Sequence, residues 1–276
     1  MSISLSFLIT MPIFAQDIAI ISPADKVIAD FITEKQTLNT SMQNIQALQQ
    51  GKVDFAIVNS NHVYDVQQST PTLKSVVALY PKVLAFITKK ESNITSLLDL
   101  KDKKFRACFT CKGTQSFCNK IFSACDIKQS YKQIPFDEAK KQLKSGEIDG
   151  LFSLVGHPNE DIRKLNKELN ITFIPLVGKK LDQLNRDYPY FVKSGMPKGI
   201  YPNLNKDIKS IGVKALLLTR EDINESCVHD LTQTILNNMK TIKETNFIYR
   251  EISKKTLLEG LVLPQHKGAA KAFNGL

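Results

Sequence analysis

The sequence predicts an α/β protein made of two similar lobes with a cleft between them. Strand-like and helix-like segments alternate along most of the 276 residues, a pattern typical of mostly parallel sheets. Two segments, GKVDFAIVNS at 51–60 and GEIDGLFSLV at 146–155, share a glycine, a charged residue, a β-branched residue, an aspartate and an apolar run. The last third returns to a strand-like segment at 210–219. We therefore expect a chain that leaves the first lobe, forms the second and comes back.

The elements of the first lobe follow from hydrophobic periodicity and capping residues. Ser41 is expected to cap a helix that runs to Gln50, and Gly51 to end it, because glycine adopts the left-handed conformation found after many helices. The continuous apolar run VDFAIV is typical of a strand covered on both faces. We expect strands at 18–21, 37–41, 53–58, 75–80 and 82–90, and a short amphipathic helix at 24–35.

The same order of elements recurs in the second lobe. A helical turn is expected after a cap at Thr95 or Ser96, and Gly146 should end a helix as Gly51 does. We expect strands at 105–109, 148–155 and 171–177, an extended piece at 130–136, and helices at 114–126, 136–145 and around 160–169. In the last third we expect the strand at 210–219, a long helix at 226–242 and a helical C-terminus.

The composition indicates a folded protein and contains no sign of an enzyme. Hydrophobic residues make up 42% and charged residues 23% of the chain, and no apolar run approaches the ~18 residues of a membrane helix. The net charge is +10, but Lys and Arg are mixed with acidic residues, so we expect a preference for anionic ligands and no nucleic-acid partner. The four histidines lack metal-ligand spacing, and no catalytic or nucleotide-binding motif occurs. We expect no catalytic residue, no cofactor and no metal.

Residues 1–15 are interpreted as a signal peptide. The block SISLSFLITMPIFA has the length of a signal-peptide apolar region, and cleavage could follow Ala15. Pro12 argues against a strand or a helix here. The block lacks a preceding Lys or Arg, so a buried N-terminal strand or a mis-assigned start codon stays as the alternative. Export predicts a periplasmic or extracytoplasmic location.

Candidate ligand-binding residues lie beyond the carboxyl ends of the predicted strands, where ligands of open α/β sheets bind. Residues 112–114 stand between a strand and a helix, where free N–H groups, the helix dipole and a lysine favour an anion. The alternative there is a simple helix cap with a solvated lysine, and the other polar residues could serve ordinary turns. These candidates are Ser22, Asn59, Ser60, Asn61, Lys112, Gly113, Thr114, Gly156 and Asn159.

Asp54 and Asp149, in the repeated pattern, are interpreted as structural residues. Each follows a helix-ending glycine and begins a strand, where a carboxylate can accept hydrogen bonds from backbone N–H groups. Equivalent positions in two lobes would also be too far apart to act on one substrate bond.

The five cysteines allow several interpretations. Four of them form the pattern C-x2-C-x6-C-x6-C, which lacks the pair of close doublets of most zinc sites. Cys118 and Cys125 share an apolar helix face with Phe122, so buried thiols are one interpretation, and Cys227 is also expected in a core. In an exported protein, Cys111 could instead form a disulfide with Cys108 or Cys118.

Several phrases resemble one family of transport proteins. They include NIQALQQGKVDFAIVNSN, SLLDLKDKKF, KGTQ, FDEAKKQLKSGEIDGLF, YPYFV, KGIYP, VKALLLTRED and LEGLVLPQHKGAAKAF, in the family's order from about residue 43 to the C-terminus. The sequence is thereby similar to TAXI-type substrate-binding proteins of TRAP transporters, the extracytoplasmic "immunogenic protein" group. The first strand-to-helix turn departs from the family, since IISPADKVIADF has neither glycine nor tyrosine. Cysteines also replace common glycines in CFTCKGTQ.

The resemblance implies the type II periplasmic-binding-protein fold, with two α/β lobes, a hinge and an interlobe cleft. We expect residues 16–88 and 206–276 in the first lobe and 89–205 in the second. The resemblance also implies that Tyr188 and Tyr190 lie near the cleft, although alone they would be interpreted as core aromatics. It implies a monomer that captures a dicarboxylate or an amino acid, such as 2-oxoglutarate or glutamate, and delivers it to a TRAP-type membrane permease.

Two rival hypotheses stay open at this stage. The altered first turn fits a binding-fold protein that has lost its transport ligand and acts as a surface or sensory partner. The second rival is an enzyme on a two-lobed α/β fold, which substrate turnover would reveal.

Overall fold

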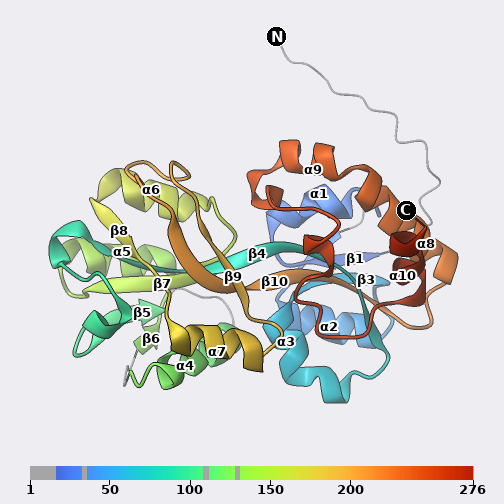
Figure 1. The fold of residues 1–276 in the computed structure, drawn as a ribbon, viewed down its shortest axis with the longest axis horizontal. Coiled ribbons are helices and arrows are strands. Elements are labelled where there is room, and N and C mark those ends of the chain that lie inside the picture. The colour runs from blue at the N-terminus through green and yellow to red at the C-terminus, as the bar shows by residue number, and fades with distance from the viewer. Residues whose placement is uncertain (1–16, 33–35, 108–111, 128–130, 276) are drawn as a thin grey trace, which may run out of the picture.

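The computed structural model describes residues 17–32, 36–107, 112–127 and 131–275, and for residues 36–38 and 112–114 it describes the backbone only. The predicted signal peptide therefore lies outside the described residues. Two long strands, β4 (Leu73–Lys89) and β10 (Ile208–Arg220), cross the middle of the molecule and join its two halves (Figure 1). No helix in the described part is long and apolar enough to span a bilayer.

Each half has its own hydrophobic core. The core of each half consists of two apolar clusters. One cluster of the first half contains Tyr80 of β4 and Ala215 of β10, and one cluster of the second half contains Leu84 of β4 and Val213 of β10. The boundary between the two cores therefore lies within the two long strands, between Tyr80 and Leu84 in β4 and between Val213 and Ala215 in β10. The first lobe, on the right in Figure 1, contains β1 (Ile18–Ile20), α1 (Lys26–Ala29), β2 (Gln36–Leu38), α2 (Ser41–Gln49), β3 (Phe55–Asn59), α3 (Ser60–Val66), α8 (Glu225–Asn237), α9 (Met239–Thr245) and α10 (Lys267–Asn274).

The second lobe lies on the left in Figure 1. The lobe boundaries expected at 88 and 206 stay predictions, and the core packing favours a crossing within β4 and β10 themselves. This lobe contains β5 (Phe105–Ala107), α4 (Lys112–Ala124), β6 (Tyr131–Gln133), α5 (Phe136–Ser145), β7 (Gly150–Val155), α6 (Glu160–Glu168), β8 (Ile171–Ile174), α7 (Lys179–Asp187) and β9 (Val192–Met196).

The strands form one mixed sheet in the order β2-β1-β3-β10-β4-β7-β5-β6, with β8 paired to β4 and β9 to β10. β1 pairs in parallel with β2 and β3, and β5 pairs in parallel with β6 and β7. The expectation of mostly parallel pairing therefore holds within each lobe. It is wrong at the centre, where β4 and β10 run antiparallel to each other and to their other neighbours. The reason is that β4 carries the chain out of the first lobe and β10 brings it back.

The two strands expected at 75–80 and 82–90 are one continuous strand, β4. Pro81 lies between the two expected strands, and proline lacks the N–H that a strand interior donates. In the structure, Pro81 lies opposite Lys214 of β10, next to a register shift of that ladder. β7 joins β4 from Val83 onward, so Pro81 precedes the change of partner instead of ending the strand.

Several helix boundaries differ from the sequence-based expectation. Thr40, not Ser41, caps α2, in a reciprocal capping box with Gln43. The helix expected at 24–35 is a short 3-10 turn (Pro23–Asp25) followed by α1. The helix expected at 226–242 is divided at Asn238 into α8 and α9, because the Asn238 side chain donates to the backbone oxygen of Thr234 and the chain leaves helical geometry there.

The repeated pattern at 51–60 and 146–155 forms the same helix–turn–strand unit in both lobes. Gly51 and Gly146 have φ of +65° and +81°, which is the left-handed conformation expected after a helix. The backbone N–H of Asp54 donates to the carbonyl of Asp17 (2.9 Å). In the second lobe, the N–H of Asp149 donates in the same way to Lys104 (2.8 Å). These bonds join β3 and β7 to the starts of their neighbouring strands.

The two long strands bind these units in the same way. Thr219 of β10 donates its hydroxyl to the carbonyl of Asp54 (2.8 Å), and Thr88 of β4 donates to that of Asp149 (2.7 Å). The carboxylate of Asp149 accepts from the backbone N–H of Lys104, and that of Asp54 pairs with Arg220. The interpretation of both aspartates as structural residues agrees with these contacts.

Candidate ligand-binding site

A cleft of about 540 Å³ lies between the lobes beside β4. Its lining comes from the first strand-to-helix turn, the end of β3, the middle of β4, the start of α5 and the β7–α6 connection, so both lobes contribute. It is lined by Ile21, Ser22, Pro23, Ala24, Asn59, Tyr80, Lys82, Ile134, Pro135, Phe136, Ser153, Leu154, Val155, Gly156, Pro158, Asn159, Glu160, Asp161 and Ile248.

A buried carboxylate supports the wall of the first lobe. Asp25 is fully buried and accepts hydrogen bonds from the Tyr80 hydroxyl (2.6 Å) and the Ile21 backbone N–H (3.0 Å). Burial raises the pKa of Asp25, and the nearby ammonium of Lys82 opposes that rise. Burial, together with the charge of Asp25, raises the pKa of Tyr80 well above its usual value, so this hydroxyl stays a donor. The resulting arrangement fixes the first turn against β4.

Lys82 is the only Lys or Arg among the described residues that line the cleft. It lies on β4 opposite Val213 of β10, in the part of the strand that passes between the two cores. An ammonium in a cleft that excludes much of the water attracts an anion more strongly than one on the open surface. Lys82 thus offers one positive charge to a negatively charged group, in a lining that also contains the acidic residues Glu160 and Asp161.

Asn59 ends β3 with an amide oxygen that has no hydrogen-bond partner among the described residues. The residue is only 6% exposed, and it lines the cleft. Its backbone N–H donates to the Ser41 hydroxyl (3.1 Å), which holds the residue in place at the first turn of α2. A buried polar atom without a partner costs about 1–3 kcal/mol, so a ligand that supplies a donor would recover that energy.

The wall of the second lobe contains a closed hydrogen-bond chain. The Nε2 atom of His157 lies 3.2 Å from the carbonyl of Val83, and Nδ1 lies 2.5 Å from the Tyr201 hydroxyl. A carbonyl can only accept, so Nε2 carries the proton and Nδ1 accepts from Tyr201. The Tyr201 oxygen in turn accepts from the backbone N–H of Asn159 (2.8 Å). Burial lowers the pKa of His157 to about 4, so the ring is neutral at pH 7.

The C-terminal segment of the first lobe holds this wall from behind. Arg250 donates to the backbone oxygens of His157 (2.9 Å) and Gly195 (3.1 Å). Ile248 packs so closely on Gly156 that an added Cβ would lie 2.0 Å from the Ile248 Cδ1. The β7–α6 connection is therefore clamped between β4 and residues 248–250.

The structure brings four of the predicted site residues into the cleft. Ser22 and Asn159 also cap helical turns, since the Ser22 hydroxyl accepts from Ala24 and the Asn159 amide oxygen accepts from Asp161 and Ile162. Each of these two residues therefore lines the cleft and also caps a helical turn. The four residues in the cleft are Ser22, Asn59, Gly156 and Asn159.

Other predicted residues do not line the cleft. Ser60 is buried, where its hydroxyl accepts from the N–H of Lys214 and donates to the carbonyl of Tyr190, and Asn61 is also buried. Tyr190 is fully buried, and Tyr188 lines a separate pocket between α4 and α7. α4 begins at Lys112, two residues before the expected start, so Lys112, Gly113 and Thr114 form its first turn instead of preceding it. The side chains of residues 112–114 are outside the description, so the anion site expected there stays a prediction.

Sequence reasoning missed Asp25, Tyr80 and Lys82. A signal for Lys82 existed, because it is the one charged residue inside the apolar run from Val76 to Thr88. Asp25 stood in a segment expected to be an exposed amphipathic helix, so its burial could not be recognised. The hydroxyl that satisfies it comes from Tyr80, 55 residues further along the chain.

No disulfide joins the cysteines that the structure describes, which are Cys118, Cys125 and Cys227. Cys118 is buried, and its thiol and that of Cys125 are free. Burial raises the pKa of the Cys118 thiol well above its usual value, as expected for a thiol in an apolar core. The structure therefore does not support a bond to Cys118, whereas Cys108 and Cys111 lie outside the described residues. No cluster of metal-ligating side chains occurs in the described ranges.

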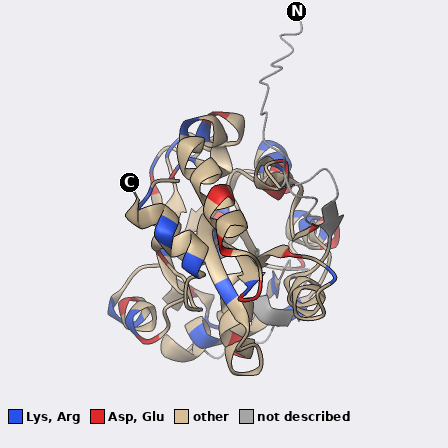
Figure 2. Cartoon of the chain, turned by 90° about the vertical axis from the view of Figure 1, so that its right-hand side faces the viewer, with Lys and Arg blue, Asp and Glu red and all other residues tan. Residues whose placement is uncertain are grey.

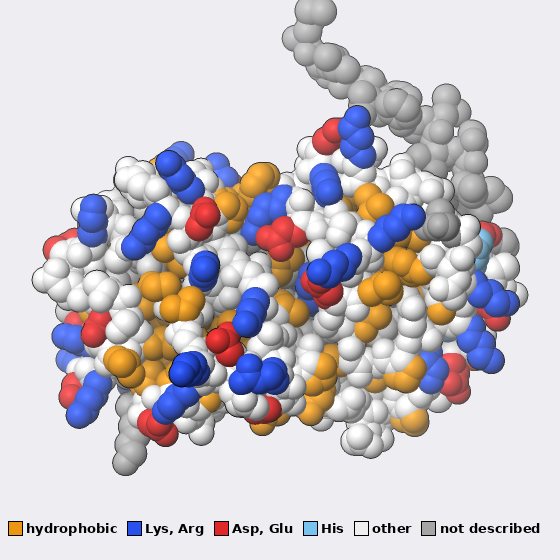
Figure 3. Space-filling model, in the orientation of Figure 1, with side chains coloured by type: hydrophobic (Ala, Val, Ile, Leu, Met, Phe, Trp, Pro, Cys, Tyr) orange, Lys and Arg blue, Asp and Glu red, His pale blue; other side chains and the backbone are white. Residues whose placement is uncertain are grey.

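Charged side chains are dispersed over the surface. Figure 2 shows lysines and arginines on many helices with acidic residues among them, and Figure 3 shows no continuous basic patch on the face it displays. A nucleic-acid site would need cationic groups gathered along one face or groove. The pictured faces thus match the mixed charge pattern of the sequence.

The fold and the cleft define the class of protein. Two α/β lobes, joined by two crossing strands and separated by a cleft, form the architecture of type II periplasmic solute-binding proteins. Solved structures of this class match most of the chain, and their low sequence identities make this a likeness of fold. The chain itself belongs to the NMT1-like family, whose model matches residues 18–275.

Three solved structures illustrate the similarity. The periplasmic aliphatic sulphonate binding protein SsuA from Escherichia coli has a TM-score of 0.54 and 14% identity, over 94% of this chain and 82% of that one. An ancestral arginine-binding protein bound to arginine has a TM-score of 0.53 and 16% identity, over 84% and 98%. The arginine-, lysine-, histidine-binding protein ArtJ from Geobacillus stearothermophilus has a TM-score of 0.50 and 11% identity, over 86% and 94%. All three are binding proteins.

Proposed function

We propose that this protein is an extracytoplasmic solute-binding protein that captures a small anionic metabolite in the interlobe cleft and presents it to a membrane permease. The observation that carries the proposal is that Lys82 and Asn59 line the same cleft, and that the amide oxygen of Asn59 has no hydrogen-bond partner among the described residues. The ammonium supplies charge attraction for an anionic group. The Asn59 oxygen accepts a hydrogen bond from a donor elsewhere on the same ligand.

Ligand capture would proceed by hinge closure about β4 and β10. These are the strands in which one core gives way to the other, so small backbone changes there alter the angle between the lobes without disturbing either core. A ligand that contacts Lys82 and Asn59 on one side and the β7–α6 connection on the other binds the closed form better. It therefore shifts the population toward closure.

The ligand we propose is a dicarboxylate or an amino acid, with 2-oxoglutarate and glutamate as the first candidates. One cation from the first lobe can hold one carboxylate, while Lys112 at the start of α4 is proposed as the second anion-binding group. The proposed partner is a TRAP-type permease, following the resemblance of the sequence to TAXI-type proteins. We further propose that the mature protein is exported after removal of residues 1–15 and acts as a monomer.

The test combines native mass spectrometry of freshly purified protein with a thermal-shift screen of dicarboxylates and amino acids. A carried ligand, or stabilisation by a candidate acid, supports the proposal because a ligand of the folded state raises the melting temperature with concentration. The Lys82→Met variant should lose that stabilisation. No carried ligand, together with no shift for any candidate acid, would contradict it and favour a binding-fold protein without a transport ligand.

A further inference from the structure

Helix α3 of the first lobe touches the second lobe. It contacts α4 and lies next to α7, below the crossing strands in Figure 1. Val63 on α3 is buried in a first-lobe cluster together with Val58 of β3, whereas the next residue, Tyr64, packs against a cluster of the second lobe. α3 therefore has one side in the core of its own lobe and another side on the neighbouring lobe.

Three tyrosine rings from the two lobes meet at this contact. The ring centroid of Tyr64 lies 4.9 Å from that of Tyr190 and 6.1 Å from that of Tyr188. The centroids of Tyr188 and Tyr190, which follow α7, are 5.6 Å apart. Rings at these spacings attract each other when their planes are tilted, as they are in all three pairs, because the positive edge of one ring faces the negative face of the other.

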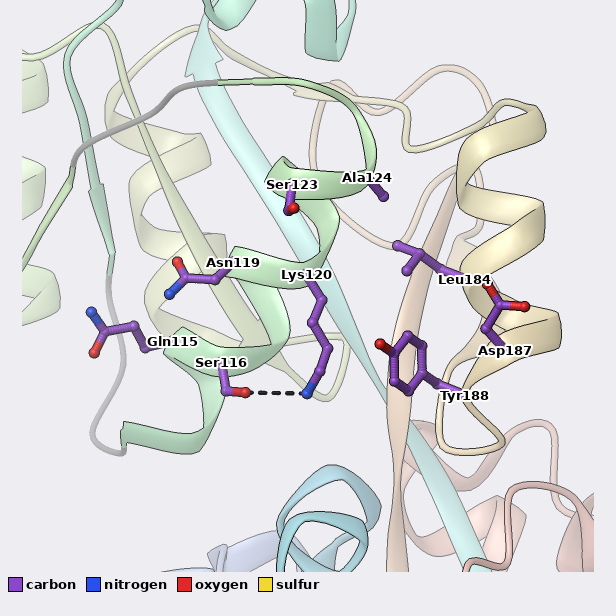
Figure 4. Close-up of a pocket in the computed structure, with 9 residues that line it drawn as sticks. All are labelled: Gln115, Ser116, Asn119, Lys120, Ser123, Ala124, Leu184, Asp187 and Tyr188. Carbon is purple, nitrogen blue, oxygen red and sulfur yellow. Dashed lines mark hydrogen bonds between the residues drawn. The ribbon is translucent and has the colours of Figure 1, made fainter.

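Lys120 adds a charge to the same contact. Figure 4 shows its side chain extending from α4 toward the ring of Tyr188, with its ammonium donating to the Ser116 hydroxyl (3.2 Å). The ammonium lies 5.4 Å and 5.5 Å from the ring centroids of Tyr188 and Tyr190. It also forms an ion pair with Asp65 of α3, at 3.5 Å. One lysine of the second lobe therefore contacts the second-lobe rings and a first-lobe carboxylate.

The start of α3 is attached to the same place by hydrogen bonds. The Ser60 hydroxyl accepts from the backbone N–H of Lys214 on β10 (3.1 Å) and donates to the carbonyl of Tyr190 (3.4 Å). Ser60 is fully buried, and a low local dielectric strengthens such bonds. The tyrosine cluster is thus connected to one of the two strands that join the lobes.

We propose that Tyr64, Asp65, Lys120, Tyr188 and Tyr190 form an interlobe latch, which holds the lobes of the ligand-free protein together. The ring contacts of Tyr64 and the ion pair of Asp65 cross the lobe boundary, so a hinge rotation that moves α3 away from α4 breaks them together. The latch itself requires no ligand. Its consequence for binding rests on the proposed function: only joined lobes offer both cleft walls, so the latch raises the apparent affinity of the cleft.

The rings contribute more to the latch than the ion pair. A partly exposed ion pair changes an equilibrium by up to about fivefold. One aromatic pair changes it by about two- to tenfold, and Tyr64 makes two such pairs across the boundary. Removing the Tyr64 ring should therefore raise the ratio of separated to joined lobes by about ten- to hundredfold, and removing the charge of Asp65 by about two- to fivefold.

The ring contacts are tested by small-angle X-ray scattering of the ligand-free protein, with urea denaturation to verify that each variant is folded. Tyr64→Ala should increase the radius of gyration and the maximum dimension. Tyr64→Phe, which keeps the ring, should match wild type, and Asp65→Asn should give a smaller increase than Tyr64→Ala. Unchanged scattering in folded Tyr64→Ala, or equal expansion in Tyr64→Phe, would overturn the latch, whatever the cleft binds.

The ion pair is tested by charge reversal in the same measurement. Asp65→Lys brings two ammonium groups together and should expand the protein, whereas the double variant with Lys120→Glu should return toward the wild-type dimensions. Glu168→Lys is the matched control, because it makes the same change of charge opposite Lys140, which is as exposed as Lys120 (25% and 26%) but pairs within the second lobe. A double variant as expanded as Asp65→Lys, or a control that expands equally, would show that no ion pair joins the lobes.

Discussion

The two walls of the interlobe cleft use their polar groups in opposite ways. On the first-lobe wall, Lys82 and Asn59 line the cleft, and the buried amide oxygen of Asn59 has no hydrogen-bond partner among the described residues. On the second-lobe wall, His157, Tyr201 and Asn159 satisfy one another and the carbonyl of Val83. The first wall contains an amide oxygen without a protein partner, at Asn59, whereas the second wall uses its polar groups to hold its own shape.

This difference separates affinity from stability. A polar group left without a partner costs energy in the empty protein and returns it when a ligand binds, whereas a satisfied group stabilises the fold and has little left to offer a ligand. Substitutions on the two walls should therefore be distinguishable by whether they change ligand binding or the free energy of unfolding. Asp25 is the exception, because it supports the first wall from inside the core.

The largest effect is expected for Asp25→Ala. Its removal leaves the Tyr80 hydroxyl and the Ile21 N–H without their acceptor in a buried site. We expect a loss of about 3–4 kcal/mol in the free energy of unfolding, measured by urea denaturation. Asp25→Asn, which keeps one acceptor oxygen, should lose clearly less. Equal losses in the two variants would show that the carboxylate does not act through these hydrogen bonds.

The pH dependence of stability should reveal His157. Its pKa is lowered from 6.5 in the unfolded chain to about 4 in the folded protein, so its contribution is complete above pH 6.5 and is lost as the pH falls toward 4. We expect wild-type protein to lose about 3 kcal/mol more than His157→Gln between pH 7 and pH 4. Parallel curves for the two proteins in urea denaturation at several pH values would contradict a neutral buried imidazole.

Lys82→Met tests the charge on the first wall. The long apolar side chain fills similar space but cannot attract an anion, so we expect affinity for the acid identified in the thermal-shift screen to fall by about 30- to 100-fold. Isothermal titration calorimetry measures the change, and the free energy of unfolding serves as the control. Unchanged affinity would place the anionic group elsewhere in the cleft.

Tyr201→Phe tests the second wall. The variant leaves the Asn159 N–H and the His157 Nδ1 without a partner, and we expect a loss of about 2 kcal/mol in the free energy of unfolding. Ligand affinity should change by less than about threefold, because the hydroxyl is used inside the wall. A large loss of affinity with little loss of stability would reverse the comparison between the walls.

Asn59→Ala should give the smallest change in the free energy of unfolding, and it should separate ligand affinity from stability most clearly. Removing an oxygen that lacks a partner should leave the empty protein equally stable or slightly more stable. Affinity for the ligand should nevertheless fall by about tenfold, the value of one good hydrogen bond. Calorimetry and urea denaturation of the same preparation check both expectations. A destabilised variant with full affinity would show that the oxygen serves the fold.

Local sequence patterns predicted most of the elements, because each rests on residues close together in the chain. Gly51 and Gly146 end helices, and α5 spans Phe136–Ser145, as expected from the helix FDEAKKQLKS. The error at Pro81 has a tertiary cause, since two neighbouring strands support β4 on either side of the proline. Part of the site was predictable for the same local reason: Ser22, Asn59, Gly156 and Asn159 all follow strands.

The sequence by itself determined the α/β class, the two-lobed plan and the strand ends where a ligand could bind, since periodicity, capping and glycine conformation act within a few residues. Only the tertiary structure decided which of those ends share a cleft and which polar groups stay available there. Asp25 meets Tyr80, and His157 meets Tyr201, across long stretches of chain. Burial then sets their protonation and their hydrogen bonds, because desolvation depends on neighbours that the fold alone brings together.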